Sequence, residues 1–203
     1  MIPVIKKPEP PDFDSKVRQP GLRYLESNPN PDFKRRRRYW SKAKSDLYHT
    51  YDGICAYSCF YLVDDGSVDH FLPKSRRPDL AYEWDNYRLA SQRMNSNKGD
   101  SIDVIDPFHV QKGWFAIDFP SCLVRIGSKL HNSFVDQIEK TIEELKLNTD
   151  DYFVQARCDI MISYASDEFD LSFLEKKYPF IASEISRQNI TQADAKALFK
   201  RRT

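Results

Sequence analysis

The chain has 203 residues with nearly balanced charge, 31 Lys or Arg against 30 Asp or Glu, and 40% of its residues are hydrophobic. This length and apolar content are enough for a folded core and exclude a chain that is disordered throughout. No run of 18 apolar residues occurs, and the first residues are too polar and proline-rich for a signal peptide. We therefore expect a cytoplasmic protein with no membrane partner and with reduced cysteines.

The charge is unevenly distributed along the chain. Residues 1–50 hold 12 Lys or Arg against six Asp or Glu, whereas residues 51–150 hold 11 against 16. Seven of the 12 prolines fall within residues 1–34, which predicts an extended, basic N-terminal arm over residues 1–39. The run Arg35, Arg36, Arg37 and Arg38 either contacts a nucleic-acid backbone or docks a partner protein. The first reading is favoured, because clustered arginines bind phosphates without reading sequence.

The central segment, residues 40–110, predicts a compact sequence of small elements. A short helix over residues 40–51 precedes an apolar strand, Cys55–Val63, and a tight turn leads into a second strand over residues 67–71. After a loop, residues 87–90 resemble a short strand, and residues 91–98 predict a helix closed by Gly99. The order hairpin, loop, short helix indicates a ββα unit.

The remaining segment, residues 111–203, predicts a strand and helix extension packed on this core. Strands are expected around Pro120, within residues 114–126, and a Ser133 cap is expected to begin the first of several amphipathic helices. The further helices are predicted over residues 152–164, 171–178 and 192–200, the last capped by Thr191. We expect a single domain of the α+β class overall.

Five polar residues of the central segment have the types and spacing that phosphodiester hydrolysis needs: Asp69, His70, Asn86, Asn95 and Lys98. A hard cation such as Mg²⁺ (or Mn²⁺) prefers oxygen ligands, and one carboxylate with one amide suffices, which points to Asp69 and Asn95. His70 faces the opposite side of the strand from Asp69, and imidazole is a suitable base for a water molecule near neutral pH.

The other candidates have supporting roles. Asn86 is expected to bond backbone groups across the loop and so fix His70, although alone it could be an ordinary turn former. Lys98 lies three positions after Asn95, where it either contacts a phosphate oxygen or is a solvated end of a helix. Lys74, Arg76 and Arg77 follow the motif strand and are expected to bind phosphates of nucleic acid.

The stretches VDHFLPKS (68–75), WDNYRLA (84–90) and NSNKGD (95–100) together resemble the HNH motif of the ββα-metal nucleases. They are similar to the HNH domain of RNA-guided CRISPR nucleases. The whole chain more closely resembles bacterial HNH proteins of anti-phage systems such as Septu and certain retrons. The resemblance covers about residues 50–105 most securely. It implies His70 as the general base, Asp69 and Asn95 as metal ligands, and Asn86 as the central orienting residue.

One departure from the HNH pattern concerns zinc. Many HNH proteins carry two CxxC pairs around the motif, but here the corresponding places read Cys55-Ala56-Tyr57-Ser58 and Ser91-Gln92-Arg93-Met94. A structural zinc needs four soft or borderline ligands, so we expect no structural zinc in this chain.

These features predict a metal-dependent HNH endonuclease that hydrolyses DNA, most readily double-stranded DNA, as the effector of an anti-phage system. Two alternatives stay open. The substrate could be RNA, such as tRNA, because a metal ion and a base can act on either sugar. The chain could also be an effector subunit that is inactive until a partner ATPase delivers it.

Overall fold

The structure is a computed structural model that describes residues 1–33, 38–128 and 132–199. The chain divides into two compact units. The motif unit comprises Ile5–Ala56 and Leu62–Ile102, and the helical unit comprises Met1–Val4, Tyr57–Tyr61 and Asp103–Thr203. The described residues combine helices with two small antiparallel sheets, which confirms the α+β class. The sequence predicted three consecutive segments, whereas each of these units is formed by separate stretches of the chain.

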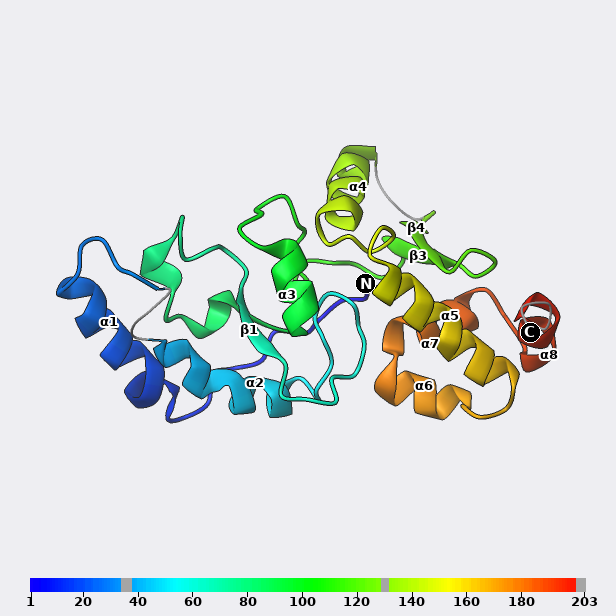
Figure 1. Cartoon of the computed structure of the whole chain (residues 1–203), viewed down its shortest axis with the longest axis horizontal. Helices are drawn as coiled ribbons and strands as arrows, with labels where there is room; N and C mark the ends of the chain where they lie inside the picture. The colour runs from blue at the N-terminus through cyan, green and yellow to red at the C-terminus, as the bar shows by residue number, and fades with distance from the viewer. Residues whose placement is uncertain (34–37, 129–131, 200–203) are drawn as a thin grey trace. The chain divides into compact units, whose positions relative to one another are not determined.

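The motif unit contains a strand, loop, strand and helix that carry the polar residues singled out above. Strand β1 (Ser67–His70) pairs antiparallel with β2 (Tyr87–Ala90), so that Asp69 faces Arg88. Helix α3 (Gln92–Lys98) follows β2 and packs on both strands, beside β1 in Figure 1. The Ser91 side chain accepts a hydrogen bond from the backbone of Met94 and so caps α3. The predicted strand over residues 87–90 and the predicted helix ending at Gly99 are confirmed.

The predicted hairpin strand Cys55–Val63 is wrong. This segment is made of turns and irregular backbone with an isolated bridge at Tyr61, and β1 pairs with β2 instead. Most of its apolar side chains are buried, and Cys59 has a φ of 57°, a left-handed conformation that breaks a strand. A continuous apolar run indicates burial but does not distinguish a strand from a buried series of turns.

The prediction of an extended N-terminal arm is also wrong. A π-helical turn (Asp14–Arg18) continues into α1 (Gln19–Glu26), and a 3₁₀ turn (Tyr39–Ala43) continues into α2 (Lys44–Thr50). The wider π turn comes just before Pro20, which has no N–H to donate to a preceding turn. Pro20 therefore lies in the first turn of a helix, a position that proline tolerates, and does not extend the chain there.

Buried contacts hold this N-terminal segment within the motif unit. The Phe13 ring lies edge-on to Trp84 and to Tyr87, with ring centroids 5.5 and 5.8 Å apart. A Cβ added at Gly21 would lie only 2.1 Å from the Tyr82 ring, so this close approach of α1 requires glycine. The loop between β1 and β2, which carries Tyr82 and two 3₁₀ turns (Pro78–Leu80 and Trp84–Asn86), is thus covered by α1.

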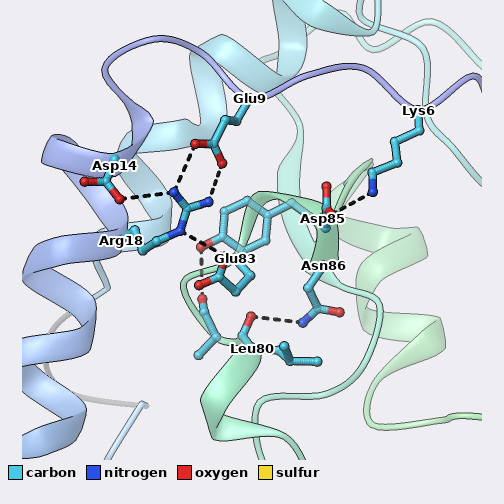
Figure 2. A network of polar contacts seen from close by, with 10 residues as sticks. Lys6, Glu9, Asp14, Arg18, Leu80, Glu83, Asp85 and Asn86 are labelled. Atoms are coloured by element: carbon cyan, nitrogen blue, oxygen red, sulfur yellow. Dashed lines mark hydrogen bonds and ion pairs between the residues drawn. The ribbon is translucent and has the colours of Figure 1, made fainter.

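An ionic cluster around Arg18 adds to these contacts, as Figure 2 shows. The guanidinium donates to Glu9, to Asp14 at 3.1 Å and to Glu83 at 2.9 Å. Lys6 makes a separate ion pair with Asp85 at 2.6 Å. Residues distant in sequence are therefore joined on the loop that precedes β2.

The helical unit contains a hairpin of β3 (Phe115–Asp118) and β4 (Leu123–Ile126), which confirms the strands predicted around Pro120. Five helices follow in the described residues: α4 (Val135–Glu144), α5 (Asp151–Ala165), α6 (Leu171–Lys177), α7 (Pro179–Arg187) and α8 (Gln192–Phe199). Helix α5 packs against α8, and α6 packs against α7. Helix α7 was not predicted. The Thr191 hydroxyl accepts a bond from the backbone of Asp194, as expected of a cap, whereas the predicted Ser133 cap is wrong because α4 begins after Phe134 without a side-chain cap.

Buried polar side chains connect the elements of the helical unit. Arg157 of α5 donates from Nε to the Cys122 carbonyl and from Nη2 to the Leu147 carbonyl, each at 2.6 Å. Glu184 of α7 accepts a bond from the backbone N–H of Ile117 in β3 at 2.9 Å. Two early segments join the later ones, because Val4 N–H donates to the Pro107 carbonyl and Tyr61 N–H to the Lys177 carbonyl. None of the helices in the described ranges has both the length and the apolarity needed to cross a membrane.

Candidate active site

A cavity of about 730 Å³ in the motif unit brings together residues that the sequence had separated. Three of the five catalytic and metal-binding candidates line it directly: Asp69 and His70 from β1 and Asn95 from α3. Its other described charged lining residues are Arg38, Lys44, Lys74 and Asp100. Carboxylate, amide, imidazole and ammonium groups thus share one cavity.

The end of β1 places Asp69 and His70 in different surroundings. Asp69 is 2% exposed, and its Oδ1 accepts a hydrogen bond from the Lys98 ammonium at 3.2 Å. His70 instead contacts the rings of Trp40 and Tyr87, both oriented edge-on, at centroid distances of 5.1 and 5.2 Å. This difference agrees with the alternation of side chains along a strand.

The hydrogen bonding of His70 defines which ring nitrogen can accept a proton. Nε2 lies 2.9 Å from the carbonyl oxygen of Ala81, and a carbonyl only accepts, so Nε2 carries the hydrogen. The neutral ring therefore has Nδ1 as its acceptor. Burial, helped by the nearby Lys74 ammonium, lowers the pKa of His70 to about 3, which keeps the ring neutral at physiological pH.

Asn86 bridges the loop between β1 and β2. Its Oδ1 accepts the backbone N–H of Leu72 at 2.8 Å, and its Nδ2 donates to the carbonyls of Leu72 and Leu80 at 3.0 and 3.2 Å. The bond to Leu80 is drawn in Figure 2. Leu80 directly precedes Ala81, the partner of His70, so Asn86 fixes the backbone that orients the imidazole. These are the cross-loop bonds expected of Asn86; its part in catalysis stays a prediction.

Asn95 is held to β1 through one end of its amide. Nδ2 donates to Ser67 Oγ at 3.1 Å and to the Val68 carbonyl at 3.3 Å. The oxygen end, Oδ1, is the part of this side chain that could bind a cation. Together with the Asp69 carboxylate it gives a pair of hard oxygen donors, a set that suits Mg²⁺ or Mn²⁺ with several retained waters.

Clusters richer in metal-binding side chains are missing from the part of the chain that the structure describes. No group of three or more His, Cys, Asp or Glu residues there could hold a metal ion. Asp69 and Asn95 do not count as such a group, because they are only two residues and asparagine is not one of these four types. All four cysteines are free thiols in buried positions, and the expectation of no structural zinc stays a prediction.

Lys98 differs from its expected position. Its side chain is fully buried, and Nζ donates to Asp69 and, at 3.1 Å, to the His70 carbonyl. A phosphate contact at the surface would need an exposed ammonium, so the sequence-based reading of Lys98 is replaced by an internal ion pair. The reason is geometric: α3 packs on β1, and Lys98 lies on the packed face of its last turn.

The basic residues predicted to bind nucleic acid fall into distinct groups. Lys74 and Arg38 line the cavity. Arg76 and Arg77 are exposed and do not belong to its described lining, and Arg77 forms an ion pair with Asp79 at 2.6 Å. Arg35, Arg36 and Arg37 lie outside the described residues. The structure thus directs attention to Lys74 and Arg38 among these cations.

Trp40, for which the sequence predicted no role, contacts two site residues. Its ring packs edge-on to His70, and the Lys74 ammonium lies 5.4 Å from its ring centroid. Burial lowers the pKa of Lys74 below its usual range, while Asp100 and Asp69 oppose this shift. A buried tryptophan after an arginine run gives no spacing signal, because its partners lie 30 or more residues further along the chain.

Asp100 is a second residue with no predicted role. Its Oδ2 accepts a hydrogen bond from the Ser75 hydroxyl at 2.8 Å. This bond joins the PKS sequence after β1 to the KGD sequence after α3, two of the stretches that carried the HNH resemblance. The occurrence of PKS and KGD together in the sequence was the only signal that could have indicated a contact between Ser75 and Asp100.

Comparisons with known proteins add no family to these observations. No protein-family model matches the chain, and no significant match was found among curated proteins.

Proposed function

We propose that the motif unit is a metal-dependent endonuclease of the ββα-metal (HNH) type that hydrolyses phosphodiester bonds in DNA. One observation carries the proposal. His70, kept neutral by burial and oriented by the bond from its Nε2 to Ala81, lines the same cavity as the oxygen donors Asp69 and Asn95. These are the base and the hard-cation ligands that hydrolysis of a phosphodiester requires.

In this proposal each residue has a separate task. Nδ1 of His70 accepts a proton from water as the water oxygen attacks phosphorus and one P–O ester bond breaks. Asp69 and Asn95 would hold Mg²⁺ or Mn²⁺, which supplies positive charge for the phosphate and the leaving oxygen. Asn86 keeps His70 oriented through the backbone at Leu80, and the leaving oxygen takes its proton from solvent.

The basic lining supports nucleic acid as the substrate. Arg38, Lys44 and Lys74 line the cavity together with His70. A phosphate backbone gains affinity from such cations without any base contact. Lys74 is the best placed of the three to meet a phosphate, because Trp40 holds its ammonium beside the general base.

The experiment is cleavage of plasmid DNA by the purified chain with Mg²⁺ or Mn²⁺. We expect nicking or linearisation that EDTA abolishes and that His70→Ala reduces by about two or more orders of magnitude, the usual contribution of a general base. His49→Ala is the matched control, because the His49 imidazole is exposed on α2, bonds to Ser45 and lies outside the described lining of the cavity.

Two results would contradict the proposal. Undiminished cleavage by His70→Ala would remove the assigned base, and cleavage that resists EDTA would remove the metal. A parallel digestion of RNA separates the substrates: preferred cleavage of RNA would keep the chemistry but replace DNA. Activity that appears only after a partner ATPase is added would instead identify the chain as a dependent effector subunit.

A further inference from the structure

We infer that Lys98 is a built-in cation on the candidate metal ligand Asp69, so that a divalent ion binds tightly only together with a phosphate group of the substrate. The inference rests on the proposed function, since it concerns the metal and the substrate of that same site. It makes metal loading and nucleic-acid binding cooperative.

The contact between Lys98 and Asp69 is fully enclosed. The lysine side chain has no exposed surface and the aspartate side chain is 2% exposed, with Nζ 3.2 Å from Oδ1. Nζ also donates to the His70 carbonyl, and it lies 5.9 Å from the centroid of the Phe71 ring. The carboxylate therefore has a permanent counter-charge, unscreened by solvent, before any metal ion arrives.

The surrounding charges favour an anion over a lone cation. The described charged residues that line the cavity are three cations, Arg38, Lys44 and Lys74, and two carboxylates, Asp69 and Asp100. Lys98 adds a fourth cation directly behind Asp69. Lys44 also forms an ion pair with Asp65, at 3.3 Å, and Asp100 accepts a hydrogen bond from Ser75. A divalent ion entering alone would add two positive charges to a site that is already positive.

A phosphate group changes this balance. Its negative oxygens meet both the cavity cations and a divalent ion at Asp69 and Asn95, so each ligand offsets the repulsion that the other faces. Binding equilibria are reciprocal, so nucleic acid raises the metal affinity by the same factor by which metal raises the affinity for nucleic acid. The free protein would hold its metal weakly, and the loaded site would form on the substrate.

The test measures Mn²⁺ binding by electron paramagnetic resonance, in the His70→Ala background so that nucleic acid is not consumed. Mn²⁺ is titrated alone, with a short DNA duplex and with an RNA hairpin. We expect DNA to raise the Mn²⁺ affinity by about tenfold or more, the size of a typical coupling between two ligands. Lys98→Met should raise the affinity for Mn²⁺ alone by about tenfold and shrink the effect of DNA, because a buried like charge is removed.

Lys42→Met is the matched control, since it removes one exposed lysine charge that lies outside the described lining of the cavity. It should leave the affinity for Mn²⁺ alone nearly unchanged. Lys98→Gln provides a second variant that retains a hydrogen-bond donor toward the His70 carbonyl, in case methionine prevents folding. Thermal unfolding with and without Mn²⁺ supplies a further readout: the metal should raise the melting temperature of the Lys98 variants more than that of the parent.

The outcomes separate this inference from the proposed function. If Mn²⁺ binds the parent equally well with and without DNA or RNA, and Lys98 variants bind it no more tightly, the built-in cation has no such role while the metal site stands. If Mn²⁺ does not bind under any of these conditions, the proposed metal-dependent function fails together with the inference. Coupling to RNA but not DNA would support the inference and change the substrate.

Discussion

At the scale of single residues, His70 is notable because its surroundings oppose its charged form. It is buried among aromatic rings, and Lys74 and Lys98 add positive charge nearby, effects that the hydrogen bond from Nε2 to Ala81 only partly offsets. Burial lowers its pKa to about 3 in the folded protein, compared with 6.5 for the unperturbed side chain. In the unfolded chain the imidazole takes up a proton at a much higher pH.

This difference predicts a specific acid sensitivity. Between pH 6.5 and pH 3 the unfolded state binds the proton and the folded state does not, so stability falls as the pH is lowered through 6.5. His70 should contribute a loss of about 2 kcal/mol in the free energy of unfolding between pH 7 and pH 5. Urea unfolding of the parent and of His70→Gln at both pH values measures it. An equal loss in both proteins would show that His70 is not the titrating group.

Much of the site could be expected from residue types and spacing, but its contacts could not. The alternation of a strand correctly separates Asp69 from His70, and the Asn86 bonds match a residue that bridges a loop. The partner of Lys98 was missed, because sequence spacing does not reveal which face of a two-turn helix packs on the strands. Trp40 was missed because its contacts depend on tertiary packing alone.

At the scale of elements, the segment before α2 shows how packing overrides composition. Its prolines predicted an extended arm, yet Phe13 and Val17 are buried and α1 lies against the loop of residues 71–86. The same packing explains the wrong hairpin, since β1 takes β2 as its partner across that loop. Local patterns located β2 and α3 well, because their boundaries depend on neighbouring residues such as the Ser91 cap and Gly99.

Arg18 is expected to fasten this N-terminal segment. Arg18→Met leaves Glu9, Asp14 and Glu83 without their common partner, and it should lower the free energy of unfolding by about 1–2 kcal/mol, a range limited by partial solvent screening. Limited proteolysis should then cut within residues 5–26 sooner. Lys16→Met, which removes an exposed lysine paired with Asp12, should leave both measurements nearly unchanged. Equal effects of the two substitutions would contradict the assigned role.

At the scale of the whole molecule, each unit has its own set of buried polar connections. Arg157 satisfies two carbonyls in the helical unit, and burial lowers its pKa to about 10. In the motif unit, Asn86 and Lys98 have the corresponding function for the loop and for α3. Loss of one connection should therefore be felt mainly within the unit that contains it.

Arg157→Met tests this separation. It removes the guanidinium donors of the Cys122 and Leu147 carbonyls, which should cost about 2–4 kcal/mol of stability. Hydrogen exchange should accelerate in α5 and β4, while α3 and β1 keep their protection. Arg125→Met, on an exposed position of β4, is the control. Uniform loss of protection along the chain would show that the two units unfold as one.

The path of the chain through the two units has a consequence for its synthesis. Residues 1–4 and 57–61 belong to the helical unit but leave the ribosome before residues 103–203, which complete that unit. The backbone N–H of Tyr61 can reach its acceptor only after Lys177 has been synthesised, and that of Val4 only after Pro107 has been synthesised. The motif unit, by contrast, is complete in sequence once residue 102 has emerged. A chain shortened to residue 102 retains the whole motif unit, whereas no shortening from one end isolates the helical unit, because residues 1–4 and 57–61 belong to it.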